Sequence, residues 1–222
     1  MNQIPKIEFK NRKTIAVSIT PMGEVVVKAP IGCPMSFIDK FLIEKQAWIE
    51  TKLKKTNTRN EKFAEIIEYK KLLFMGKSYF GYSSGAVKKI TIIEDKILIP
   101  VSVSQDKVHN KITRWYHKMA DQLLIARTKE ISNMLKIVPT NIKCTGSRGR
   151  WGACNSNGEL FLNWRCIMLP AHLIDYVIVH ELAHLIELNH SPRFWAEVEK
   201  VLPNYKSLRK QIKEYGFCLK LF

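Results

Sequence analysis

The 222-residue chain lacks the cysteine spacing of a disulfide framework or a zinc ribbon. Its five cysteines are odd in number, and no two of them form a Cys-x-x-Cys pair. Disulfide frameworks use even sets of cysteines in oxidising compartments, whereas unpaired cysteines are typical of a reducing one. We therefore expect free thiols and a cytoplasmic protein.

Long apolar runs are also missing. No segment approaches the roughly 18 consecutive apolar residues of a membrane-spanning helix, and residues 1–13 have no signal-peptide core. Internal repeats and low-complexity segments are absent. With 46% hydrophobic and 25% charged residues, the composition is that of an ordinary soluble protein with a core. We expect no membrane partner.

Acidic residues are few, 20 against 36 lysines and arginines, which gives a net charge of +16. Residues 1–110 and 111–222 each contribute +8, so the excess is not a basic tail. A general positive field attracts nucleic acid, nucleotides or acidic proteins. A basic surface without such a partner explains the charge equally well. The charge admits nucleic acid as a partner and does not establish it.

The strongest chemical signal is the segment His-Glu-Leu-Ala-His-Leu-Ile-Glu-Leu-Asn-His, from His180 to His190. On a helix, His180 and His184 lie one turn apart and project from one face. Glu181 is rotated by about a third of a turn, too far to be a ligand but close to whatever the histidines hold. Three neutral imidazoles with an open fourth position are typical of a catalytic zinc. The pattern predicts a hydrolase with one zinc ion.

The third zinc ligand has two candidates. The run from Asn189 to Pro192 predicts a helix break and restart, with Ser191 as N-cap and the proline in the first turn, so His190 can turn back towards the metal. The competitor is Glu187, which would lie nearly in line with the first two histidines and approximates a tetrahedron poorly. We favour His190.

The patterns divide the chain into two parts. Residues 1–104 predict a small, β-rich, mixed α/β unit with short strands between 6 and 28, a helix at 36–55 and no catalytic constellation. Residues 105–222 predict the metallohydrolase domain. Its expected elements are a long amphipathic helix at 106–136, strands at 142–145, 150–155 and 159–165, and helices at 170–188, 192–201 and 203–215. Asn155 to Gly158 predicts a hairpin turn. The expected fold class is α+β.

Three blocks occur in a specific order: Arg-Trp-Gly-Ala-Cys at 150–154, Leu-Asn-Trp-Arg at 162–165, and the histidine motif with its continuation to 195. Together they resemble the YgjP-like metal-dependent hydrolases, relatives of the SprT-type and Wss-type zinc metallopeptidases. The resemblance implies a zincin-like core made of a long helix, a small antiparallel sheet, the His-Glu-x-x-His helix and closing helices. It also implies zinc on His180, His184 and His190, with Glu181 as general base.

Two positions depart from related patterns. Ala153 stands where a serine is usual, which removes any role for that hydroxyl. Glu187 stands where metzincins have their turning glycine, so the chain must reach His190 by a different route.

The resemblance implies two rival activities. One is peptide-bond hydrolysis by zinc-bound water that Glu181 activates. The other is pyrophosphatase activity on nucleoside triphosphates, on UTP in the member that gave the family its name. A non-catalytic nucleic-acid-binding protein with a structural zinc is the least favoured class, because Glu181 would then have no role.

Each activity nominates substrate-binding residues. For a peptide, the strand predicted at 159–165 could align the substrate by edge pairing. For a nucleotide, four arginines could hold phosphate oxygens; they are Arg148, Arg150, Arg165 and Arg193. Tyr205 is a candidate for stabilising a developing oxyanion. Arg165 has an alternative structural interpretation, in which it orients the sheet. The sequence does not indicate an oligomeric state.

Overall fold

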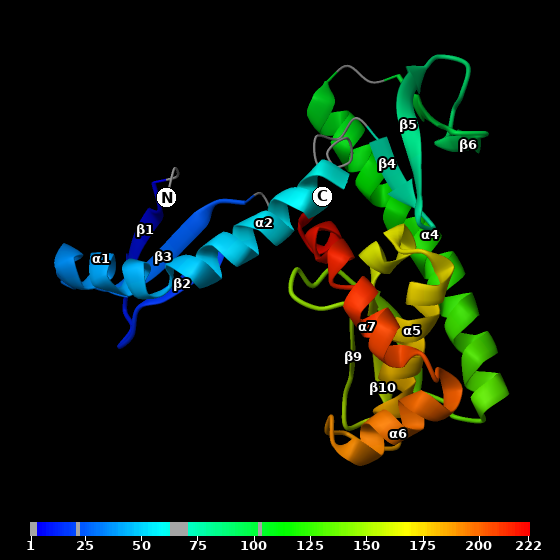
Figure 1. Ribbon diagram of the computed structural model, residues 1–222. Helices are drawn as coiled ribbons and strands as arrows, with labels where there is room; N and C mark the ends of the chain where they lie inside the picture. Colours follow the sequence, from blue (N-terminus) through cyan, green and yellow to red (C-terminus); the bar gives the residue numbers. More distant parts are fainter. Residues whose placement is uncertain (1–3, 21–22, 63–70, 102–103) are drawn as a thin grey trace. The chain divides into compact units, whose positions relative to one another are not determined.

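The computed structural model describes residues 4–20, 23–62, 71–101 and 104–222. Contacts group the chain into two compact units, Met1–Ile67 and Glu68–Phe222 (Figure 1). The sequence-based division after residue 104 therefore falls inside the second unit. None of the described helices combines the length and apolar character that crossing a bilayer requires.

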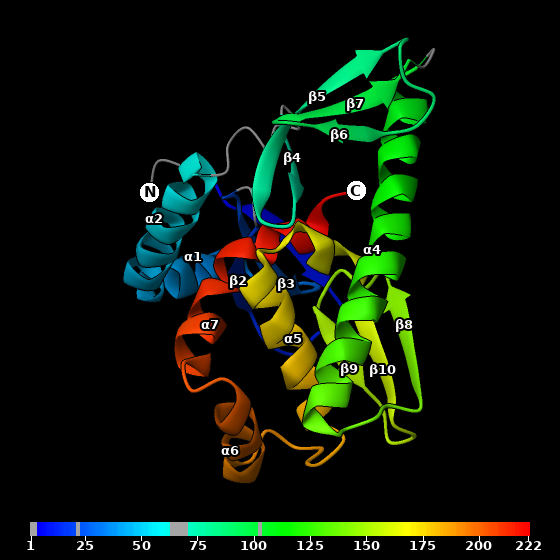
Figure 2. The same cartoon turned by 90° about the vertical axis from the view of Figure 1, so that its right-hand side faces the viewer.

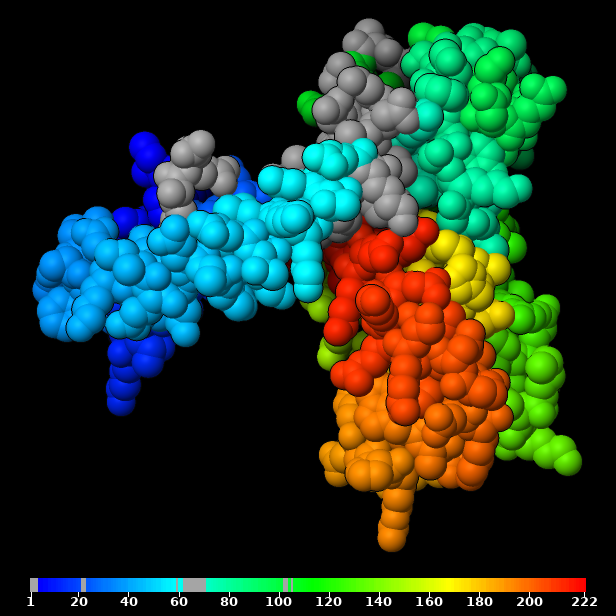
Figure 3. All heavy atoms as spheres, in the orientation of Figure 1, coloured from blue at the N-terminus to red at the C-terminus, as the bar shows by residue number. Residues whose placement is uncertain are grey.

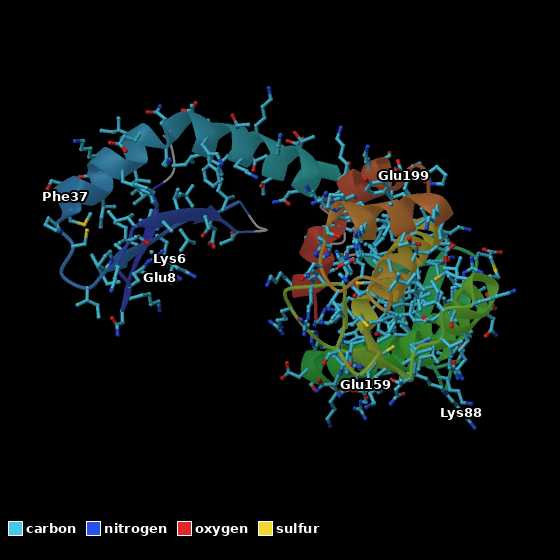
Figure 4. All side chains as sticks on the ribbon, turned by 90° about the horizontal axis from the view of Figure 1, so that it is seen from below. Lys6, Glu8, Phe37, Lys88, Glu159 and Glu199 are labelled. Atoms are coloured by element: carbon cyan, nitrogen blue, oxygen red, sulfur yellow. The ribbon has the colours of Figure 1, made fainter. Side chains whose placement is uncertain are left out.

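The described residues of the first unit form a three-stranded sheet and two helices. Its strands are β1 (Lys6–Lys10), β2 (Ala16–Ile19) and β3 (Val25–Pro30), and its helices are α1 (Met35–Glu44) and α2 (Gln46–Lys62). Central β3 is parallel to β1 and antiparallel to β2. Its buried core consists of Val25, Val27, Ala29, Ile38, Leu42 and Ile49. The single helix predicted at 36–55 is two helices, which separate at Lys45. Phe37 lies on α1 and is 66% exposed (Figure 4).

The first described residues of the second unit form a four-stranded sheet. It comprises β4 (Lys71–Phe74), β5 (Lys77–Ser84), β6 (Thr91–Ile93) and β7 (Lys96–Pro100), in the order β4-β5-β7-β6. The β4–β5 turn has Met75 and Gly76 at positive φ, as a tight hairpin requires. A Cβ on Gly76 would lie 2.7 Å from the Pro170 Cα, so only glycine lets this turn approach the segment that leads into the motif helix.

Helix α4 (Gln105–Leu135) matches the predicted helix to within one residue at each end. It ends at Lys136, which adopts the left-handed conformation. Figure 2 shows the β4–β7 sheet beside the N-terminal part of α4 and a second small sheet beside its C-terminal part. The Tyr116 hydroxyl on α4 donates a 2.7 Å hydrogen bond to the Leu73 carbonyl of β4. Helix α4 therefore connects the two sheets of this unit.

The second small sheet contains β8 (Asn141–Thr145), β9 (Gly152–Cys154) and β10 (Glu159–Asn163), in the order β8-β10-β9. The turn predicted at 155–158 joins β9 and β10 as an antiparallel hairpin. In contrast to the all-antiparallel expectation, β8 pairs with β10 in parallel. Since β10 is paired on both sides, the expectation that it offers an edge to substrate is wrong. The edge strands are β8 and β9.

The remaining elements complete an α+β unit. A 3₁₀ turn η1 (Trp164–Met168) leads into α5 (Ala171–Ala183), followed by α6 (Pro192–Val201), α7 (Tyr205–Gln211) and η2 (Glu214–Lys220). Helix α5 contacts α4 on one side and α7 on the other (Figures 1 and 2). It is apolar nearly all round, and Leu173, Ile178 and Leu182 are fully buried. Helices α6 and α7 form one continuous surface of the unit (Figure 3).

Candidate metal centre

The end of α5 places two histidines on one face. His180 lies in the last turn, and His184 is the C-cap with helical φ and ψ of −67° and −16°. The spacing of one helical turn therefore extends through His184 although the helix itself ends at Ala183. Leu185, Ile186 and Glu187 close this end of the helix through backbone hydrogen bonds to Leu182 and Ala183.

A second helix start supplies the third histidine. The Ser191 hydroxyl accepts a 3.3 Å hydrogen bond from the Phe194 backbone N–H, and Pro192 is the first residue of α6. His190 directly precedes this cap, and its Nε2 lies 3.0 Å from Nε2 of His180. Potential ligand atoms of all three histidines lie within 4.8 Å of one another. The break and restart predicted from the sequence are present.

The spacing of His180 and His190 suits a shared metal ion. At Zn–N distances of about 2.0–2.1 Å, tetrahedral ligand nitrogens are separated by about 3.3 Å, close to the His180–His190 distance. The ring Nδ1 of His184 bonds to the Glu187 backbone oxygen at 3.2 Å, which leaves its Nε2 for a metal. Burial, followed by the two other histidines and Arg209, lowers the pKa of His180 to about 3. The ring is therefore neutral, as metal binding requires.

Glu181 lies beside this cluster and is 6% exposed. Burial raises its pKa to about 8, and the nearby Arg150 guanidinium opposes that shift. A divalent cation on the histidines would further favour the ionised carboxylate. The buried carboxylate and the neutral His180 are thus both consistent with a cation bound at the histidine cluster.

Gly152 of β9 makes room for this carboxylate. A Cβ at position 152 would lie 2.6 Å from both Cγ and Oε1 of Glu181, far inside van der Waals contact. The φ of Gly152 is not positive, so the backbone itself would accept other residues. The missing side chain is therefore needed for the approach of Glu181 and not for the conformation of the strand.

The histidines open onto a cavity of about 510 Å³. Its lining residues come from the β8–β9 loop, β9, α5 and the segments that follow: Arg150, Trp151, Gly152, Ala153, Cys154, Tyr176, Val177, His180, Glu181, His184, Leu188, His190 and Ile212. Burial raises the pKa of the Cys154 thiol, and Glu181 adds to the shift, so this sulfur stays protonated at neutral pH. The cavity thus offers one base, Glu181, next to three potential metal ligands.

The predicted substrate-binding residues have different locations. Arg150 lines the cavity. Arg165 is 3% exposed, and its guanidinium donates to the backbone oxygens of Leu221, Phe222 and Gly146. This contact supports the structural interpretation of Arg165.

The other nominated residues do not line the cavity. Arg148 donates to the Phe222 backbone oxygen at 3.3 Å, and Arg193 is exposed on α6. Tyr205 is buried, and its ring stacks on Trp195 with centroids 5.1 Å apart. The structure therefore brings one of the four arginines, Arg150, to the histidine cluster.

Several residues of the site were not identified from the sequence. Asn163 is 1% exposed, and its side-chain amide donates to the backbone oxygens of Ser147 and, at 2.9 Å, Arg150. It thereby fixes the loop that carries Arg150. A polar residue at the end of an apolar strand is a signal that could have suggested this pairing. Arg209 lies 4.7 Å over the Trp195 ring, but no local pattern indicates that it approaches the site.

Comparisons with known proteins bear on the family of the chain. A family model described as YgjP-like, metallopeptidase domain, matches residues 13–215. No curated protein matches the chain. Among solved structures, the chain is similar to the crystal structure of the metallopeptidase zymogen of Pyrococcus abyssi abylysin, with a TM-score of 0.38 and 24% sequence identity. That similarity covers 40% of this chain and 91% of the other.

Proposed function

The chain belongs to the YgjP-like metallopeptidase family, and from that premise we propose that it is a zinc-dependent peptidase. Its metal ligands would be His180, His184 and His190, and its general base would be Glu181. One observation carries the proposal: three imidazoles meet beside a buried carboxylate, and both line one cavity together with the edge strand β9.

Zinc held by three imidazoles supplies a Lewis acid and makes water more acidic. In this chain Glu181 would accept the proton of the attacking water and pass it to the leaving amine. Its place against Gly152 limits where the carboxylate can lie, so proton transfer would start from a fixed geometry. Arg150 would help to keep the buried carboxylate ionised.

Strand β9 would align an extended peptide. In its ladder with β10, the Asn163 N–H donates to the Trp151 carbonyl at 2.7 Å, and the Asn155 N–H donates to the Glu159 carbonyl at 3.1 Å. In an antiparallel ladder, hydrogen-bonded and non-hydrogen-bonded residue pairs alternate. Trp151 and Asn155 belong to hydrogen-bonded pairs, so Gly152 and Cys154 belong to the other kind. Their backbone N–H and C=O groups therefore point away from β10. Both residues line the cavity. A substrate that pairs with them would present its backbone next to Glu181.

A nucleotide substrate has less support. Binding a triphosphate calls for several cations around the phosphates, and of the four arginines nominated from the sequence only Arg150 lines the cavity. The edge of β9 can pair with the backbone of an extended peptide, whereas a nucleotide has no such backbone to pair with it. UTP pyrophosphatase activity therefore remains the alternative that the test must include.

The test is a direct comparison of substrates with purified, zinc-loaded protein. It is incubated with denatured casein and, separately, with UTP, and Glu181→Gln is the matched control. We expect new peptide termini from casein by mass spectrometry and no pyrophosphate from UTP. Loss of a general base lowers turnover by about 10²–10⁴-fold, so Glu181→Gln should keep zinc and lose cleavage.

Two results would overturn the proposal. Pyrophosphate release without proteolysis would assign the site to nucleotides. Full cleavage by Glu181→Gln would remove the general-base role, because the amide cannot accept the proton.

A further inference from the structure

The small sheet has two faces, and only one of them meets the histidines. Side chains alternate along a strand and share a face with their paired neighbours. Gly152 pairs with Leu162, and Cys154 pairs with Leu160; both leucines are buried, on the inner face next to α5. Ala153 pairs with Phe161, so these two side chains lie on the outer face.

The outer face has a cavity of its own, of about 290 Å³. Its lining residues are Thr145, Ser147, Arg150, Gly152, Ala153 and Phe161. The lining residues thus include an arginine, two residues with hydroxyl groups and one aromatic residue, and none of them is acidic. Within the described part of the chain, no carboxylate forms an ion pair with Arg150.

The loop that carries these donors is held in place. The Asn163 side chain binds the backbone oxygens of Ser147 and Arg150, and the Asn163 backbone N–H binds that of Trp151. The position of Arg150 relative to β9 is therefore a property of the folded sheet and not of a free loop. Arg150, Gly152 and Ala153 line both cavities, so the outer cavity adjoins the site around the edge of β9.

We propose that the outer cavity is a substrate subsite that binds an acidic side chain, Asp or Glu, of the peptide. The inference rests on the proposed function. A peptide paired with the edge of β9 sends alternate side chains to opposite faces of the sheet. Those on the outer face meet Arg150, Ser147 and Thr145, where a carboxylate gains charge-assisted hydrogen bonds. Because Gly152 touches Glu181, this residue lies within about two positions of the scissile bond.

The experiment measures which side chain the enzyme prefers at this position of the peptide, and not only the rate of cleavage. Cleavage sites that the zinc-loaded full chain makes in denatured casein are mapped by mass spectrometry, and one cleaved sequence is synthesised with Glu, Gln or Lys at the enriched position. We expect kcat/KM to fall about fivefold from Glu to Gln, as for a partly exposed ion pair, and further for Lys. Arg150→Glu should reverse the order in favour of Lys, and Arg150→Gln should abolish the preference.

The matched control is Arg148→Gln, on the same loop but outside both cavities, which should keep the wild-type order. Because the readout is a ratio between peptides, a general loss of rate in the Arg150 variants does not affect it. Cleavage without acidic enrichment, or an unchanged order in Arg150→Glu, would overturn the subsite and leave the proposed function standing. Absence of any cleavage would overturn both.

Discussion

The two faces of the β8–β10–β9 sheet differ in what surrounds them. The inner face packs Leu160 and Leu162 against α5, with 0% and 1% exposure, and holds Glu181 directly against Gly152. The outer face carries a partly exposed aromatic, hydroxyls and Arg150, and its charged groups reach solvent. The sheet separates the two environments, and its edge strand β9 lines both cavities.

This difference suggests that the two faces of the sheet have different roles. A buried face has a low effective dielectric, which strengthens electrostatic interactions and makes each position critical. A solvated face weakens each interaction and tolerates change. We therefore expect inner-face substitutions to alter metal binding and kcat, and outer-face substitutions to alter substrate preference; Arg150 lines both cavities, so its substitution should alter both kcat and preference.

The strongest test of the inner face is His190→Ala. Loss of one of three imidazole ligands should weaken zinc affinity by more than about 100-fold, since loss of merely a supporting contact already costs about 10–100-fold. His190 is exposed, so the fold should survive the change. Zinc affinity is measured by competition with a chelator, and the fold by circular dichroism.

Glu187→Gln is the control for this prediction. The Glu187 backbone oxygen, and not its carboxylate, bonds to His184, so the variant should retain zinc. Retention of zinc by His190→Ala together with loss by Glu187→Gln would make Glu187 the third ligand.

The histidine cluster was predictable because its determinants are local. Two ligands lie one helical turn apart, and the third follows from the cap at Ser191, so twelve consecutive residues, 180–191, contain the geometry. The long helix and the β9–β10 hairpin were predictable for the same reason. Local pattern could not show that β8 pairs in parallel with β10, because strand order depends on contacts distant in sequence.

The arginines show the same limit. Arg150 and Arg165 flank one hairpin and have identical side chains, yet one lines the cavity and the other binds backbone oxygens of Leu221 and Phe222. Only the long-range packing separates them. The contact of Gly152 with Glu181 could not be predicted for a further reason: glycine has no side chain, so its residue type does not indicate a role in the site.

Gly152→Ala tests whether the tight inner face fixes the general base. The added methyl would lie 2.6 Å from Cγ and Oε1 of Glu181, so the carboxylate must move. A misplacement of about 1 Å at a reacting group can cost on the order of 100-fold. We expect kcat to fall by about 10–100-fold, with zinc content unchanged and a smaller change in KM.

Two further variants separate displacement of the base from general damage. Gly149→Ala, in the neighbouring loop with no atom within 4 Å of its new Cβ, should retain full activity. Glu181→Asp shortens the carboxylate side chain and should cost less in the Gly152→Ala background than in wild type. Strict additivity of the two losses would show that Gly152 does not position Glu181.

The smallest expected effects compare two carboxylates, one on each face, in the metal-free protein. Burial raises the pKa of Glu181 on the inner face to about 8. Hydrogen bonds from Asn155 and Lys143 lower the pKa of Glu159, at the surface of the outer face (Figure 4). The measurement is the free energy of unfolding against pH, for wild type and for each glutamate-to-glutamine variant.

The difference in unfolding free energy between wild type and variant should change with pH in opposite directions for the two glutamates, and in separate pH ranges. A raised folded pKa means that folding binds a proton, so wild type loses stability relative to Glu181→Gln as the pH rises from about 4.5 to about 8. A lowered folded pKa means that folding releases a proton. Wild type therefore gains stability relative to Glu159→Gln as the pH rises through the folded pKa towards about 4.5, and by less because water screens the exposed pair. Equal pH dependence of the stability difference for the two variants would show that the two faces do not differ in effective dielectric. The proposal that the two faces have different roles would then lose its physical basis.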